Sequence, residues 1–120
     1  SAGFARWTPG WDADERAVAT AREHGIEFAT TARRVQRGDY ETFDLILAMD
    51  RSNMRSLLQE CPEHLQDKLH MMREYDQPPA PDGEIADPYH GSMADFETVF
   101  EVLDRCTDSL IARHVSSINR

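Results

Sequence analysis

Residues 43–50, with the sequence Phe-Asp-Leu-Ile-Leu-Ala-Met-Asp, decide the fold of this chain. Their centre, residues 45–49, is five apolar residues in a row, without the three-to-four-residue spacing of an amphipathic helix. A short apolar run between helix-patterned segments is typical of a parallel strand that is covered on both faces. Because ligands bind at the carboxyl ends of such strands, Asp50 marks the first place where we expect a site.

The segments on either side predict an α/β domain. Residues 12–15 resemble a capping box in which Asp12 opens a helix, and Gly25 carries the signal that ends it. After Asp50, a segment with helical spacing stops before Pro62, and residues 69–72 form a second apolar run. A helix between two strands implies a parallel crossover.

Two further segments complete the expected order of elements. Residues 40–43 are expected to lead directly into the central strand. A loop with four prolines covers residues 76–91, and loops of this length in compact domains tend to be functional or disordered. Ser92, with Asp95 three residues later, is expected to cap a last helix that runs to about His114.

Composition limits the class of protein. The chain has 120 residues, which is the ordinary size of one domain. Its formal net charge of −9 argues against a nucleic-acid partner. No window approaches the roughly 18 consecutive apolar residues of a membrane span, so no membrane partner is expected. The two cysteines show no disulfide spacing, which favours a reduced, cytoplasmic setting.

Several kinds of chemistry have no motif here. The six glycines form neither a dinucleotide-binding nor a phosphate-binding loop, so we expect no cofactor. The five histidines are scattered over unrelated elements, and no metal site is expected.

The best candidate that the residues themselves offer is Asp87-Pro88-Tyr89. Pro88 restricts Asp87 to an extended backbone, so a carboxyl group on this loop is well placed to act as a general acid. The alternative is an Asp-Pro turn with Tyr89 packed on the surface. Trp7 is likewise open to two interpretations, a lid over the core or a wall of a ligand site.

The chain resembles the low-molecular-weight protein tyrosine phosphatases over essentially its whole length. The matching motifs are Ser1-Ala-Gly, Trp7 with Gly10, Asp14-x-Arg16, His24-Gly25-Ile26, Ala32-Arg33, residues 43–50 with Ser52-Asn53, and Asp87-Pro-Tyr-x-Gly91 with Phe96-Glu97-x-Val99. The resemblance implies a three-layer α/β fold, with a four-stranded parallel sheet flanked by helices and its first strand between the second and third.

The resemblance also implies roles for five residues and a substrate class. Asp87 would be the general acid that protonates the leaving tyrosyl oxygen, and Trp7 and Tyr89 would line the slot for the phosphotyrosyl ring. Asp50 and Asn53 would support the phosphate-binding loop. The substrates would be phosphotyrosine-containing proteins or small aryl phosphates.

The family's nucleophile is the main departure. In the family a cysteine, five residues and an arginine form the phosphate loop, but here Cys61 is followed six positions later by Asp67 and Cys106 by Ala112. We therefore expect a single domain over residues 1–120 that is truncated at its N-terminus and lacks the first strand and the phosphate loop. Such a stretch would be inactive alone and at best marginally folded.

Two alternatives stay open. One is a non-catalytic remnant, or pseudophosphatase, that keeps the aromatic slot and binds partners. The other is arsenate reduction relayed through several thiols, which the absence of a second cysteine near Cys61 disfavours.

Overall fold

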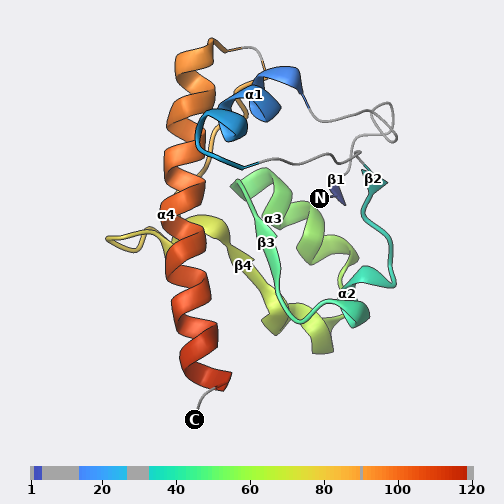
Figure 1. Cartoon of the computed structure of the whole chain (residues 1–120). Helices are drawn as coiled ribbons and strands as arrows, with labels where there is room; N and C mark the ends of the chain where they lie inside the picture. The colour runs from blue at the N-terminus through green and yellow to red at the C-terminus, as the bar shows by residue number, and fades with distance from the viewer. Residues whose placement is uncertain (1, 4–13, 27–32, 90, 119–120) are drawn as a thin grey trace.

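The computed structural model describes residues 2–3, 14–26, 33–89 and 91–118 (Figure 1). In chain order its elements are β1 (Ala2–Gly3), α1 (Glu15–Glu23), β2 (Arg33–Arg34), α2 (Asp39–Thr42), β3 (Ile46–Ala48), α3 (Arg51–Glu60), the 3-10 segment η1 (Glu63–Lys68), β4 (Leu69–Met71), the 3-10 segment η2 (Met72–Tyr75) and α4 (Met93–Ile118). Helices thus alternate with short strands, which is the pattern of an α/β domain.

The centre of the molecule is the parallel pair of β3 and β4. Ile46 lies opposite Leu69, and Ala48 lies opposite Met71. The connection between the two strands passes through α3 and η1. Both predicted strands and the helical parallel crossover between them are therefore confirmed.

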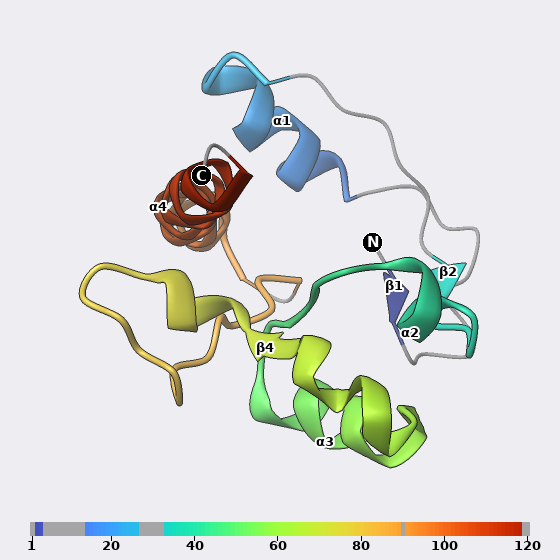
Figure 2. The same cartoon turned by 90° about the horizontal axis from the view of Figure 1, so that it is seen from below.

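Side chains along β3 and its flanks alternate between two apolar clusters. Ile46 and Ala48 belong to the cluster on the α3 side, whereas Leu45, Leu47 and Met49 pack on the α4 side. Figures 1 and 2 show α3 on one side of the β3–β4 pair and α4 on the other. Because both faces are covered, every position of this strand is apolar in the sequence.

A second, smaller pair of strands lies apart from the first. β1 and β2 are parallel, with Ala2 opposite Arg33 and Gly3 opposite Arg34. Within the described ranges this pair forms no ladder with β3 or β4, and Figure 2 shows the two pairs separated. The described strands therefore form two separate two-stranded parallel sheets.

The sequence assigned no element to residues 40–43, which were expected to lead into the central strand, and the short helix α2 occupies this segment before β3 begins. The Asp39 carboxylate accepts the Gln36 N–H at 2.8 Å and pairs with Arg33, which closes the chain into a turn. Tyr40 is then 1% exposed within the α3-side cluster. Burial of this ring favours the helical turn.

The ends of α1 differ in how well the sequence predicted them. Its N-cap is Asp14 and not Asp12, since the Asp14 carboxylate accepts the Arg16 N–H at 2.8 Å; Asp12 itself lies outside the described residues. At the other end Gly25 has a φ of 80°, which confirms the predicted glycine stop.

Ser92 and Asp95 contact each other before α4, as predicted, but the acceptor is the Asp95 carboxylate and not the Ser92 side chain, and the predicted end of the helix is too early. Asp95 accepts the Ser92 N–H at 2.8 Å and the Ser92 hydroxyl at 3.2 Å, just before the helix begins. The helix runs to Ile118, beyond His114. Although α4 has 26 residues, none of the described helices combines the length and apolar character needed to cross a bilayer.

Candidate active site

The loop between η2 and α4 returns to the carboxyl end of β3. The Ile85 N–H donates to the carbonyl oxygen of Met49 at 2.7 Å, and the Ile85 side chain is buried. Met49 directly follows β3, so this contact fixes the loop at the strand end where ligands bind in parallel sheets. Asp87, two residues further along, is exposed there.

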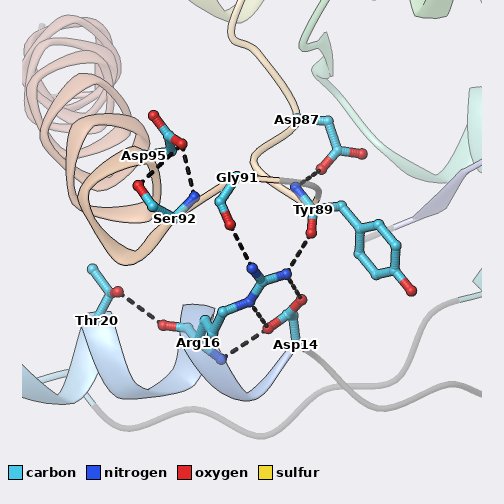
Figure 3. Close-up of polar contacts among 8 residues, drawn as sticks. All are labelled: Asp14, Arg16, Thr20, Asp87, Tyr89, Gly91, Ser92 and Asp95. Atoms are coloured by element: carbon cyan, nitrogen blue, oxygen red, sulfur yellow. Dashed lines mark hydrogen bonds and ion pairs between the residues drawn. The ribbon is translucent and has the colours of Figure 1, made fainter.

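The Asp87 carboxylate is oriented by its own loop. Its Oδ1 atom accepts the Tyr89 N–H at 3.0 Å, an Asx-turn around Pro88 that Figure 3 shows in detail. The Tyr89 side chain is 52% exposed. Of the five residues predicted for the site, these two are brought together on a single turn.

Asp50 lies at the start of α3, where it has a local role that the sequence did not assign. Its Oδ1 atom accepts the Asn53 N–H at 2.7 Å, so Asp50 is the N-cap of the helix. From the long loop, Glu84 accepts the Arg51 N–H at 2.8 Å. Two carboxylates therefore satisfy N–H groups in the first turn of α3.

Asp87 and Asp50 line different hollows at this end of the molecule. A groove of about 500 Å³ runs between α1 and α4, with Asp87 and Tyr89 at its edge and apolar side chains such as Ala21 and Phe100 along its walls. Asp50 borders a second hollow together with Glu84. Trp7, the remaining residue of the predicted site, lies outside the described residues.

Neither cysteine of the chain is placed as a nucleophile. Cys61 is 5% exposed in the α3-side cluster, and Cys106 is fully buried in the α4-side cluster. Burial raises the pKa of both thiols, whereas a nucleophilic cysteine needs a lowered pKa. Neither lines the groove beside Asp87.

Arg16 contacts the loop of the candidate acid, a contact that residue-by-residue reasoning missed. From the first turn of α1 its Nη1 atom donates to the carbonyl oxygen of Gly91 at 2.6 Å, and Nη2 donates to that of Tyr89. Its hydrogen bonds also lower the pKa of Asp14 below the usual aspartate range. The only signal in the sequence was the Asp14-x-Arg16 motif, which does not say what the arginine contacts.

No metal centre is present among the described residues, where no three His, Cys, Asp or Glu side chains come close enough to share an ion. The predictions that the protein uses no metal and no cofactor stay predictions.

A family model described as low molecular weight phosphotyrosine protein phosphatase matches residues 1–119. The chain belongs to this family. The low molecular weight phosphotyrosine protein phosphatase of Sus scrofa is 36% identical over 115 residues, which cover 94% of this chain and 72% of the porcine phosphatase. The phosphatase of the same name from Homo sapiens is 34% identical over 83% of this chain. The chain spans only 63% of that relative's length.

The fold of the family agrees with the architecture described above. A crystal structure of the protein tyrosine phosphatase from Entamoeba histolytica superposes with a TM-score of 0.91 at 30% identity, covering 98% of this chain and 74% of that phosphatase. The resemblance and the predicted α/β class, a parallel sheet flanked by helices, are both confirmed.

Proposed function

We propose that the whole protein hydrolyses phosphotyrosine, in proteins or small aryl phosphates, through a cysteinyl-phosphate intermediate with Asp87 as the general acid. The names of the relatives support the reaction class. Within this chain, the observation that carries the proposal is the exposed Asp87 carboxylate, oriented by the Tyr89 N–H at the carboxyl end of β3.

The chemical step explains why an acid is needed. A thiolate sulfur attacks phosphorus, the bond between phosphorus and the tyrosyl oxygen breaks, and its electron pair moves to that oxygen. Phenols have a pKa of about 10, so the phenoxide leaves poorly at neutral pH unless it is protonated. Asp87 in its acid form supplies this proton and becomes a carboxylate.

The other predicted residues complete the proposed site. Trp7 and Tyr89 flank the flat phosphotyrosyl ring, a role that the exposed ring of Tyr89, two residues from the acid, supports. Asp50 and Asn53 support the phosphate loop from the start of α3. We propose no metal or cofactor, no nucleic-acid or membrane partner, and a cytoplasmic location.

The nucleophile is proposed to come from a segment that is not among these 120 residues. Both cysteines present are buried with raised pKa values, and no cysteine has an arginine six positions later. The separation of the β1–β2 and β3–β4 pairs supports a missing strand between them. In this proposal residues 1–120 form one incomplete domain that is inactive alone.

The proposal is tested by the Asp87→Asn variant of the whole protein. We expect kcat/KM for phenyl phosphate to fall by about 10²–10⁴, because the amide cannot donate the required proton. Asp82→Asn, at an exposed position of the same loop, is the matched control and should leave the rate unchanged. Equal rates for Asp87→Asn and the wild type would remove Asp87 from the mechanism.

The burial of both cysteines also favours a second candidate, a non-catalytic remnant that binds partners through the aromatic slot. The gene sequence upstream of the Ser1 codon separates the two. An in-frame strand followed by Cys-x-x-x-x-x-Arg supports the enzyme, and a start codon directly before Ser1 supports the remnant.

A further inference from the structure

The turn that carries Asp87 is attached to α1 by one arginine side chain. The Nη1 atom of Arg16 donates to the Gly91 carbonyl oxygen at 2.6 Å, and its Nη2 atom donates to the Tyr89 carbonyl oxygen. These contacts join residues 73 and 75 positions apart in the sequence. Figure 3 shows the guanidinium group between the turn and the start of α1.

The guanidinium itself is held in a fixed orientation. Its Nε and Nη2 atoms both donate to the Asp14 carboxylate, at 3.2 and 3.1 Å, in the forked geometry that suits an arginine. That carboxylate is fixed in turn, since it also accepts the Arg16 N–H as the N-cap of α1. The Arg16 Cζ atom lies 4.5 Å from the centre of the buried Phe96 ring, so one face of the group packs on α4.

A continuous set of contacts connects Arg16 to the proposed acid. The residue whose carbonyl oxygen accepts from Arg16 is Tyr89, and the N–H of that residue donates to Asp87 Oδ1 at 3.0 Å. Arg16 therefore holds the residue that orients the carboxylate. Its second hydrogen bond, to the Gly91 carbonyl oxygen, holds the far end of the turn.

We propose that Arg16 is a positioning residue for general-acid catalysis: through Tyr89 and Gly91 it fixes the turn that carries Asp87, so that the Asp87 carboxyl group points to the leaving oxygen. The inference rests on the proposed function, because it requires Asp87 to be the acid. Arg16 does not touch the substrate and carries no proton in the reaction. Loss of Arg16 should thus weaken the acid step and leave the nucleophilic step intact.

Dependence on the leaving group distinguishes these steps. In the whole protein, kcat/KM is measured for aryl phosphates whose phenols have pKa values from about 4 to about 10. We expect Arg16→Met to lower kcat/KM by about 10–100-fold for the most basic leaving group and by less than about 3-fold for the most acidic, which needs no proton. Arg16→Lys, which keeps the charge but lacks the fork, should fall between Arg16→Met and the wild type and covers the case in which the methionine variant fails to fold.

Two comparisons complete the design. Arg22→Met removes an exposed arginine near the other end of α1 and should match the wild type with every substrate. In the Asp87→Asn background, Arg16→Met should add no further dependence on the leaving group, since the acid is already gone.

The results separate this inference from the proposed function. Suppose that Asp87→Asn lowers kcat/KM more for basic than for acidic leaving groups. If the Arg16 variants then lower kcat/KM equally for all leaving groups, or for none, the positioning role is overturned. If Asp87→Asn itself shows no such dependence, the acid assignment fails and the inference fails with it.

Discussion

At the scale of single residues, Asp76 fixes the start of the loop that carries the candidate acid. Its side chain is 2% exposed, and its carboxylate accepts from Arg73 Nε at 2.8 Å and from Arg105 Nε at 2.8 Å. The Gln77 N–H adds a third contact at 2.7 Å. Arg105 lies on α4, so this ion cluster around the buried Asp76 ties the loop to the helix on which it packs.

Hydrogen bonds from Arg105, then the backbone and Arg73, hold the pKa of Asp76 well below its usual range. A lowered pKa in the folded state means that the stabilisation is fully present above the ordinary aspartate pKa of about 3.9 and is lost as the pH falls below it. We expect Asp76→Asn to lower the free energy of unfolding of the whole protein by about 2 kcal/mol at pH 7.

The same variant should show a smaller loss of stability between about pH 5 and pH 3 than the wild type. Urea unfolding at several pH values measures both effects. Asp108→Asn, at an exposed position of α4, is the control and should reproduce the wild-type pH dependence. If the free energy of unfolding of Asp76→Asn fell with decreasing pH as steeply as that of the wild type, this role for Asp76 would be contradicted.

At the scale of elements, the junction between the acid loop and α4 depends on a glycine. A Cβ atom at Gly91 would lie 2.9 Å from the Cβ atom of Asp95, and also too close to the carboxylate that caps the helix. The carbonyl oxygen of the same glycine accepts from Arg16. Helix cap and loop attachment therefore meet at one residue that cannot bear a side chain without displacement.

We expect Gly91→Ala to displace the Asp95 cap, lowering the free energy of unfolding by about 1 kcal/mol. It should also reduce kcat/KM for phenyl phosphate more than for an activated aryl phosphate, because the turn that carries Asp87 shifts with Gly91. Gly38→Ala is the matched control, since its added Cβ meets nothing within 4 Å. Wild-type stability and kinetics in Gly91→Ala would show that the junction accommodates a methyl group.

At the scale of the whole molecule, the two pairs of strands are separate. Among the described residues β3 pairs with β4 alone, so its other edge is unpaired. Phe43, just before this strand, is 48% exposed. The groove between α1 and α4 exposes further apolar side chains. Unpaired apolar edges of this kind favour association between chains.

We predict that residues 1–120 expressed alone unfold without a sharp transition and associate with time. Circular dichroism during heating and light scattering measure the two properties. The matched comparison is the whole protein of the proposed function, which should melt cooperatively if the proposed strand between the two pairs covers the exposed edge. A sharp melt of the 120-residue chain well above room temperature would contradict the prediction.

The amino-acid sequence by itself determined the elements whose signals are local. The uninterrupted apolar run at residues 45–49 identified a strand covered on both faces, Gly25 a helix end, and Ser92 with Asp95 a helix cap. The motif around Asp87 made it a candidate acid, a prediction that stays untested, and the role of Tyr89 followed only from the resemblance to the family. Each of these depends on neighbours within a few positions.

Only the tertiary structure decided what depends on distant partners. No local pattern indicated α2, which forms where Tyr40 is buried against residues far along the chain, and burial is absent from local propensity. In the same way, Arg16 contacts the loop of the candidate acid through carbonyl groups more than 70 positions away. Every residue carries a backbone carbonyl oxygen, whatever its side chain. The pattern of side chains therefore could not predict which carbonyl groups Arg16 contacts.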